Sequence, residues 1–177
     1  MGSEMCIRDR PSSDEDKIVT NAKKHFEKTL VEISGELVGS AAALEHPTKN
    51  KKLNYGEIFL RDNVPVMIYL ITQKRYEIVK KFLSVCLDLQ STNYQTRGVF
   101  PTSFVEENGK LIGDYGQRSI GRITSADASL WWPILCWYYV NKSGDYAFGK
   151  SQSVQRLSLI HIPSPRDLKL SRMPSSA

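Results

Sequence analysis

Two segments of the chain are helical in pattern and almost wholly apolar, and they limit the fold more than any other feature. Residues 66–71 have almost no polar face, and residues 130–140 carry few polar side chains. A helix that is hydrophobic all round is a buried helix. We therefore expect both segments to form inner helices that other parts of the protein cover on all sides.

Amphipathic helices are expected beside these two segments. Residues 75–90 carry a broad apolar stripe, and a short link near Gln73 joins this helix to the preceding apolar one, which predicts a helical hairpin. Near the N-terminus, apolar residues recur at three- and four-residue steps from Ile18 to Leu37, behind a capping box formed by Ser13 and Asp16. The whole pattern predicts an all-α fold. Its inner and outer helices can alternate in a toroid of helical hairpins, and a generic helical bundle fits the periodicity equally.

A long loop region lies between the amphipathic segment 75–90 and the apolar segment 130–140. Residues 93–123 are rich in glycine and poor in helical periodicity. The sequence "ENGK" within it is suited to the turn of a short β-hairpin around residues 99–113. Long irregular loops inside compact domains are often functional, so this region is expected to lie near a site.

Both ends of the chain resemble translated sequencing adapter. One possible codon set for Met5–Arg10 has a reverse complement that translates as Leu157–Ile162. Two unrelated segments of a natural protein should not be related in this way, and the DNA resembles the mosaic end of a transposon-based adapter. Foreign segments are left out of fold reasoning. We expect residues 1–10 and 157–177 to be adapter-derived and residues 11–156 to be a fragment of one catalytic domain.

The charge of the chain is modest once the expected foreign ends are set aside. Lys plus Arg falls from 24 to 19 and Asp plus Glu from 19 to 16, so the net charge falls from +5 to +3. This bias is too weak to predict nucleic acid or an anionic membrane as a partner. No apolar run is long enough to span a bilayer. The sequence leaves the oligomeric state of a full-length parent open, a homo-oligomer included.

The cysteines and histidines predict a reducing compartment and no metal. Cys86 and Cys136 lie inside apolar helical runs, which favours buried thiols over a disulfide framework. This fits a cytoplasmic protein. His25 and His46 have no partners at a metal-ligand spacing, so neither a metal nor another cofactor is expected.

Two aspartates hold parallel positions in the pattern. Asp62 and Asp127 each stand at the start of an apolar helix, after a loop. The commonest role of such an aspartate is to cap the helix, and Asp62 or Asn63 suits a helix whose first turn contains Pro65. The capping interpretation therefore stands beside any chemical one.

The neighbours of these aspartates favour a sugar site. Asp62 follows Arg61 and Tyr55, and Asp127 precedes Trp131 and Trp132. Carboxylates and guanidinium groups bind hydroxyls, and flat rings pack against the apolar face of a sugar. One of two consecutive helical tryptophans must point away from a pocket and belong to the core. Trp131 is favoured for the site because it lies one turn after Asp127.

Four spaced motifs carry a resemblance to a known family. The sequences "YGEIFLRDNVP", "GVFPTSF", "SIGR" and "DASLWW" occur in this order between Tyr55 and Trp137. Together they resemble the neutral/alkaline invertase family of cyanobacteria and plants, which hydrolyse sucrose. The plant pattern is closer to Val-Asp-Ser-Gly-Leu-Trp-Trp, whereas this chain has "ADASLWW" and so leans to the bacterial form.

The resemblance implies a fold and a reaction. The family is an (α/α)6 barrel of inverting glycosidases, so the chain is expected to be a partial barrel from a sucrose-hydrolysing β-fructofuranosidase, with a small sugar as its partner. Asp127 matches the general acid of the family, and Tyr55, Arg61, Asp62 and Trp131 are the expected sugar-binding residues. The catalytic base belongs to the later half of the family chain, so this fragment is expected to be inactive.

Two other functions remain open. One is hydrolysis of another O-glycoside by the same helical toroid. The other is a non-catalytic binding module of helical hairpins, although helical repeats of that kind have a period of about 34–47 residues that this sequence lacks.

An inverting mechanism sets a condition on Asp127. One carboxylic acid protonates the glycosidic oxygen, and a second carboxylate, roughly 6.5–9.5 Å away, activates water. The acid stays protonated near neutral pH only if apolar surroundings or a like charge raise its pKa. A helix N-terminus has the opposite effect, since it favours the anion. The adjacent tryptophans and the negative charge of the base are expected to supply the compensation.

Overall fold

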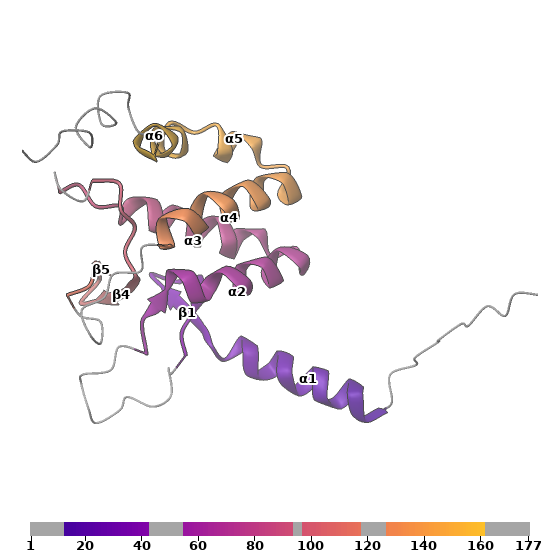
Figure 1. The fold of residues 1–177 in the computed structure, drawn as a ribbon. Helices are drawn as coiled ribbons and strands as arrows, with labels where there is room; N and C mark the ends of the chain where they lie inside the picture. The colour runs from indigo at the N-terminus through magenta and orange to yellow at the C-terminus, as the bar shows by residue number, and fades with distance from the viewer. Residues whose placement is uncertain (1–12, 43–54, 94–96, 118–126, 162–177) are drawn as a thin grey trace, which may run out of the picture.

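The computed structural model describes residues 13–42, 55–93, 97–117 and 127–161. Three helices in the middle of the chain, α2, α3 and α4, pack against one another, and α1 projects away from them (Figure 1). The elements in chain order are α1 (Ser13–Glu27), β1 (Leu30–Ile33), β2 (Glu36–Ser40), β3 (Ile58–Phe59), α2 (Leu60–Thr72), α3 (Tyr76–Asp88), β4 (Ser103–Glu107), β5 (Lys110–Asp114), α4 (Ala128–Ser143), α5 (Tyr146–Gly149) and α6 (Gln152–His161).

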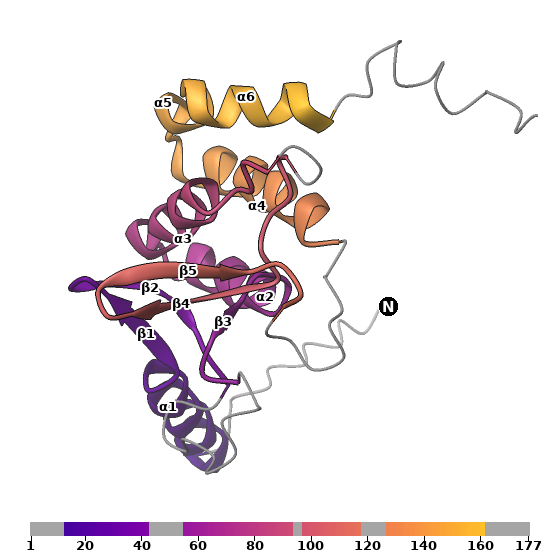
Figure 2. The same cartoon turned by 90° about the vertical axis from the view of Figure 1, so that its left-hand side faces the viewer.

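The core lies between the three packed helices and two small antiparallel sheets. The strand β2 contacts α2 and α3 as well as β3, so the sheets adjoin each other beside these helices (Figure 2). The apolar stripe predicted for α3 is buried there, and Phe82 meets Phe104 of β4 with ring centroids 6.1 Å apart. The predicted hairpin of α2 and α3 is confirmed, with its link at residues 73–75.

The long N-terminal helix predicted as far as Leu37 is wrong. The helix α1 ends at Glu27, and β1 and β2 follow as an antiparallel hairpin. Ser34 and Gly35 form its turn with φ angles of 52° and 84°, a left-handed conformation that a helix does not allow. Of the apolar residues that suggested a continuous helix, Leu30 and Ile33 are buried in β1 instead, so tertiary burial outweighs the helical spacing. The described residues are therefore mainly helical, with small antiparallel sheets beside the helices.

The short β-hairpin predicted around residues 99–113 is confirmed. The strands β4 and β5 pair antiparallel, and Glu107 faces Lys110 at the end of the ladder. Asn108 and Gly109 turn the chain with φ angles of 52° and 73°, as expected of an Asn-Gly hairpin turn. The short β3 joins the other edge of β4, which gives the strand order β3-β4-β5.

The helix α2 begins earlier than the capping pattern predicts. Its N-cap residue is Phe59, which makes no side-chain capping bond, and Asp62 lies inside the first turn. Pro65 and Pro133 both lie in the second turn of their helices, not in the first. Both rings are on exposed faces, where water can bond the carbonyl that a proline N–H does not reach.

Asn63 is buried and joins α2 to the first hairpin. Its Oδ1 accepts a hydrogen bond from the Ser40 N–H at 2.7 Å, and its Nδ2 donates to the carbonyls of Ser40 and Phe59 at 2.9 and 2.8 Å. Its side chain thus bonds both backbone groups of Ser40, which would otherwise lack partners at the end of β2. The neighbouring Gly39 is needed because a Cβ there would meet Ile58 at 2.8 Å.

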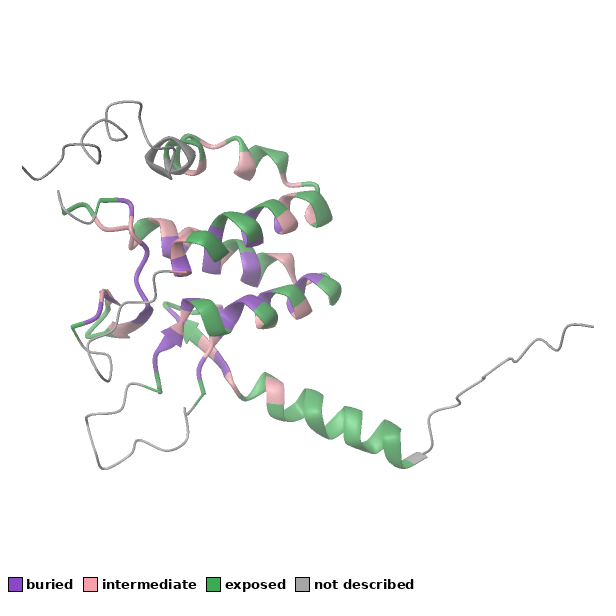
Figure 3. Ribbon diagram, viewed as in Figure 1, coloured by how far each residue is buried: buried purple, intermediate pink, exposed green. Residues whose placement is uncertain are grey.

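Among the residues described, neither α2 nor α4 is covered on all sides. Ile68 of α2 is exposed, and Leu130, Ile134 and Trp137 form an exposed apolar stripe along α4 (Figure 3). The opposite face of α4, which includes Trp132 and Leu135, lies in the core. The described helices agree with an α-helical fold, and the partial (α/α)6 barrel stays a prediction.

Gly144 and Asp145 form the caps at the C-terminal end of α4. Gly144 ends the helix in a left-handed conformation with φ of 77°, and Asp145 caps α5 by accepting a hydrogen bond from the Phe148 N–H at 3.0 Å. The other carboxylate oxygen of Asp145 accepts from Lys80 Nζ at 2.7 Å and from the Tyr139 hydroxyl at 3.0 Å. One carboxylate therefore connects α3, α4 and α5.

This connection predicts a loss of stability in acid. The hydrogen bond from Lys80, followed by that from the Phe148 N–H, holds the pKa of Asp145 below its ordinary value near 3.8. A lowered pKa contributes stability above the unfolded-state pKa, and this stability is lost as the pH falls through the folded-state pKa. Asp145→Asn keeps the cap but loses the ion pair. We expect it to lower the free energy of unfolding at neutral pH by up to about 1 kcal/mol, since both side chains of the pair are partly exposed.

Urea unfolding between neutral pH and about pH 3 measures this effect. The stability difference between wild type and Asp145→Asn should shrink as the pH falls below about 4. A difference that stays constant over this range would contradict the role of the charge.

Candidate active site

Three of the four sequence motifs meet at the starts of α2 and α4. The Leu60 N–H, at the start of α2, donates to the Thr102 carbonyl at 3.0 Å. The Phe100 N–H donates to the Ser129 hydroxyl at the start of α4 at 3.4 Å. The segment "GVFPTSF" therefore bonds to both helix starts. The "SIGR" motif lies outside the described residues.

Four of the five predicted site residues are close together here. The guanidinium of Arg61 lies between two carboxylates, with Nη1 at 3.7 Å from Asp127 Oδ2 and Nε at 3.6 Å from Asp62 Oδ1. The Trp131 Nε1–H donates to the same Asp127 oxygen at 3.3 Å. The side chains of Arg61, Asp62 and Asp127 are 59%, 65% and 39% exposed, so the cluster is open to a solute.

The carboxylate of Asp127 does not cap α4. The residue occupies the N-cap position, and its backbone carbonyl accepts from the N–H groups of Leu130 and Trp131. Its side chain makes no capping hydrogen bond. Instead the carboxylate contacts Arg61 and Trp131, which weakens the purely structural interpretation of this aspartate.

The two tryptophans divide as the helical geometry predicts. Trp132 is 1% exposed, stacks on Phe100 with centroids 5.3 Å apart, and donates its Nε1–H to the Leu83 carbonyl at 3.1 Å. Trp131 is 38% exposed beside Asp127. The exposed Tyr55 lies in the turn before β3. Sugar contacts by Tyr55 and Trp131 stay predictions.

Sequence reasoning missed two buried carboxylates near this end of the helices. Glu57 accepts a hydrogen bond from the Ser103 hydroxyl at 2.6 Å. Asp114 faces Ser103 across the β4–β5 pair and accepts from the Gly116 N–H at 2.9 Å. Buried carboxylates are costly unless they are bonded, so these two organise the loops around β4. Neither lies in a periodic segment, and the only signal for Glu57 was its place within "YGEIF".

The thiols are buried, as predicted, and are not nucleophiles at neutral pH. Cys86 and Cys136 are both free and buried. Burial raises the pKa of Cys136 to about 11 and that of Cys86 well above its ordinary value, so both stay protonated. Within the described ranges, no group of three or more His, Cys, Asp or Glu side chains could hold a metal ion. No helix among the described residues has the length and apolar character needed to cross a membrane.

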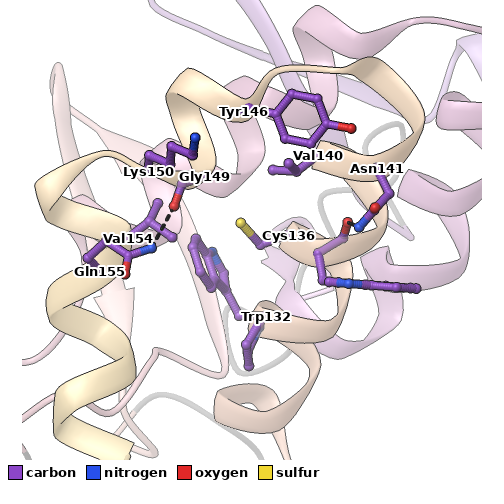
Figure 4. Close-up of a pocket in the computed structure, with 11 residues that line it drawn as sticks. Trp132, Cys136, Val140, Asn141, Tyr146, Gly149, Lys150, Val154 and Gln155 are labelled. Atoms are coloured by element: carbon purple, nitrogen blue, oxygen red, sulfur yellow. Dashed lines mark hydrogen bonds between the residues drawn. The ribbon is translucent and has the colours of Figure 1, made fainter.

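An apolar hollow of about 460 Å³ lies elsewhere, between α4, α5 and α6 (Figure 4). Trp132, Cys136 and Val140 line it from α4, with Tyr146 and Val154 opposite. No carboxylate is among its described lining residues, whereas glycoside hydrolysis needs an acid–base pair of carboxyl groups. The cluster around Asp127 is the better candidate site.

Comparison with known proteins decides the family. The family profile described as "Alkaline and neutral invertase" matches residues 22–162. The chain belongs to the alkaline and neutral invertase family. "Neutral/alkaline invertase 1, mitochondrial" of Oryza sativa subsp. japonica is 34% identical over 166 residues, which cover 84% of this chain and 26% of the rice protein. "Alkaline/neutral invertase CINV2" of Arabidopsis thaliana is 31% identical over 159 residues, which cover 83% of this chain and 28% of that protein.

This chain spans about a quarter to a third of the length of the relatives that it matches. The family match covers all three converging motifs, and its range contains the residues of the cluster around Asp127. The resemblance predicted from the four motifs is confirmed.

Proposed function

We propose that this chain is part of an enzyme that hydrolyses sucrose with inversion, with Asp127 as the general acid. One observation supports this most directly. The Asp127 carboxylate stands where three family motifs meet and contacts Arg61 and Trp131 instead of capping its helix.

The chemistry needs two carboxyl groups on opposite sides of the scissile bond. In the proposal, the protonated Asp127 donates its proton to the glycosidic oxygen as the bond to the leaving sugar breaks. A second carboxylate takes a proton from the attacking water, from roughly 6.5–9.5 Å away. We place that base in a part of the enzyme outside this chain. Tyr55, Asp62 and Trp131 would bind the sugar, and Arg61 belongs to the same cluster.

The proposed partner is a small sugar, and the proposed location is the cytoplasm. The names of the relatives include a cytosolic, a mitochondrial and a chloroplastic invertase. The location is therefore a proposal about this chain and not a property of the family.

Sucrose turnover by a full-length protein that carries this segment tests the function. We expect it to release glucose and fructose, with the first-formed anomer inverted as seen by proton NMR. The 177-residue chain alone should release no sugar under the same conditions, because it lacks the proposed base. Sucrose turnover by the short chain would contradict the two-part site. Turnover of another O-glycoside but not of sucrose would favour a different substrate.

A further inference from the structure

We propose that Arg61 is a positioning residue for Asp127, held in place by Asp62, and that it orients the acid from the neighbouring helix. This rests on the proposed role of Asp127 as the general acid. Arg61 lies in the first turn of α2 and Asp127 at the start of α4. The arginine therefore links two helices that are distant in sequence but packed together.

The geometry places one hydrogen-bond donor and one cation beside the same oxygen of the acid. Arg61 Nη1 lies 3.7 Å from Asp127 Oδ2, and the Trp131 Nε1–H donates to that oxygen at 3.3 Å. The hydrogen bond from Trp131 and the ion pair with Arg61 together restrict the orientation of the Asp127 carboxyl group.

Asp62 explains how a cation can stand beside an acid. A bare guanidinium next to Asp127 would favour the anion and weaken the acid. Asp62 Oδ1 lies 3.6 Å from Arg61 Nε, so the pair of Asp62 and Arg61 is neutral as a whole. The protonated Asp127 then faces a neutral pair that can still orient it.

The contribution of Arg61 should appear in catalysis more than in stability. Its side chain and that of Asp127 are well exposed, and ion pairs between exposed side chains contribute little to folding. Misplacing a reacting group by about 1 Å can cost on the order of 10²-fold in rate. Removal of Arg61 should therefore leave a folded enzyme whose general acid, Asp127, is poorly oriented.

The test compares two leaving groups on a full-length protein that carries this segment. Sucrose needs a proton on its leaving oxygen. A glycosyl fluoride does not, because the C–F bond breaks to release fluoride while water attacks the anomeric carbon and gives its proton to the base. Both α-glucosyl fluoride and β-fructosyl fluoride are assayed, and the one that the wild type hydrolyses is used.

Arg61→Met is expected to lower kcat for sucrose by about 10²-fold, with KM for sucrose and the rate with the fluoride nearly unchanged. Arg61→Lys keeps the charge and should recover part of the sucrose rate. Arg75→Gln removes another arginine that pairs with a carboxylate, that of Glu27, far from the site along α2, and should leave both rates unchanged.

Three results would overturn the inference. Equal losses on both substrates, or a raised KM for both, would make Arg61 a sugar-binding residue. An unchanged sucrose rate in Arg61→Met would show that the acid needs no such support. A wild-type enzyme that hydrolyses the fluoride but not sucrose would refute the proposed function itself, and the inference about Arg61 would fall with it.

Discussion

Asp127→Asn is expected to lower sucrose turnover by a full-length protein that carries this segment by about 10²–10⁴-fold. The amide N–H is far too weak an acid to protonate the glycosidic oxygen, so the leaving sugar would have to depart as an unprotonated alkoxide, which is a poor leaving group. The fold should persist, because the Asp127 side chain makes no capping hydrogen bond and its ion pair with Arg61 is partly exposed. The amide oxygen can still accept from the Trp131 Nε1–H. Initial rates with sucrose and a thermal unfolding midpoint for each protein measure the two effects.

A matched control exists at the other end of the same helix. Asp145→Asn makes the same chemical change next to the end of α4, where the carboxylate caps α5 and bonds Lys80. It should keep sucrose turnover near the wild-type value. Near-normal turnover in Asp127→Asn would return Asp127 to a structural role at the start of its helix.

Trp132→Ala is expected to lower the free energy of unfolding by about 3–5 kcal/mol, the range for deleting a large buried aromatic side chain. Trp132 is 1% exposed and stacks on Phe100, so its loss leaves a cavity between α4 and the loop before β4. Trp131→Ala should cost much less, about 0.5 kcal/mol or below, because that ring is partly solvated. Urea unfolding of both variants measures the difference.

Trp132→Phe separates the contribution of aromatic packing from that of the Nε1–H hydrogen bond. It keeps an aromatic ring against Phe100 but leaves the buried Leu83 carbonyl without the Nε1–H donor. The expected cost is intermediate and includes about 0.5–1.5 kcal/mol for the lost hydrogen bond, because the Leu83 carbonyl keeps its helical partner within α3. Similar costs for Trp131→Ala and Trp132→Ala would show that the division between core and surface is wrong.

Features with a local cause could be predicted from the sequence. The Asn108-Gly109 turn, the left-handed Gly144 and the Asp145 cap each depend on a few adjacent residues, and all three are present. The hairpin of α2 and α3 also follows from neighbouring apolar patterns. In these cases the preferred backbone angles and the nearest hydrogen bonds are already specified within a few residues.

Features that depend on a distant partner were missed or misplaced. The spacing from Ile18 to Leu37 satisfies a helix, yet the residues after Glu27 form a hairpin because their burial against α2 and α3 is the larger gain. Asn63 looked like a cap, whereas it is buried and bonds Ser40, which lies 23 residues earlier. No local pattern contains the position of such a partner.

The candidate site also combines features that the sequence specifies with features that only the fold specifies. The sequence by itself determined which residue types are present, that one tryptophan of the pair is core, and which family the motifs resemble. Only the tertiary structure decided that Arg61 lies between Asp62 and Asp127, and that the Asp127 carboxylate contacts Arg61 and Trp131 without capping α4. These contacts arise because α2 and α4 pack side by side with their starts bonded to the same segment before β4. Helix packing depends on the fit between surfaces that lie far apart in the sequence, so local sequence patterns do not specify it.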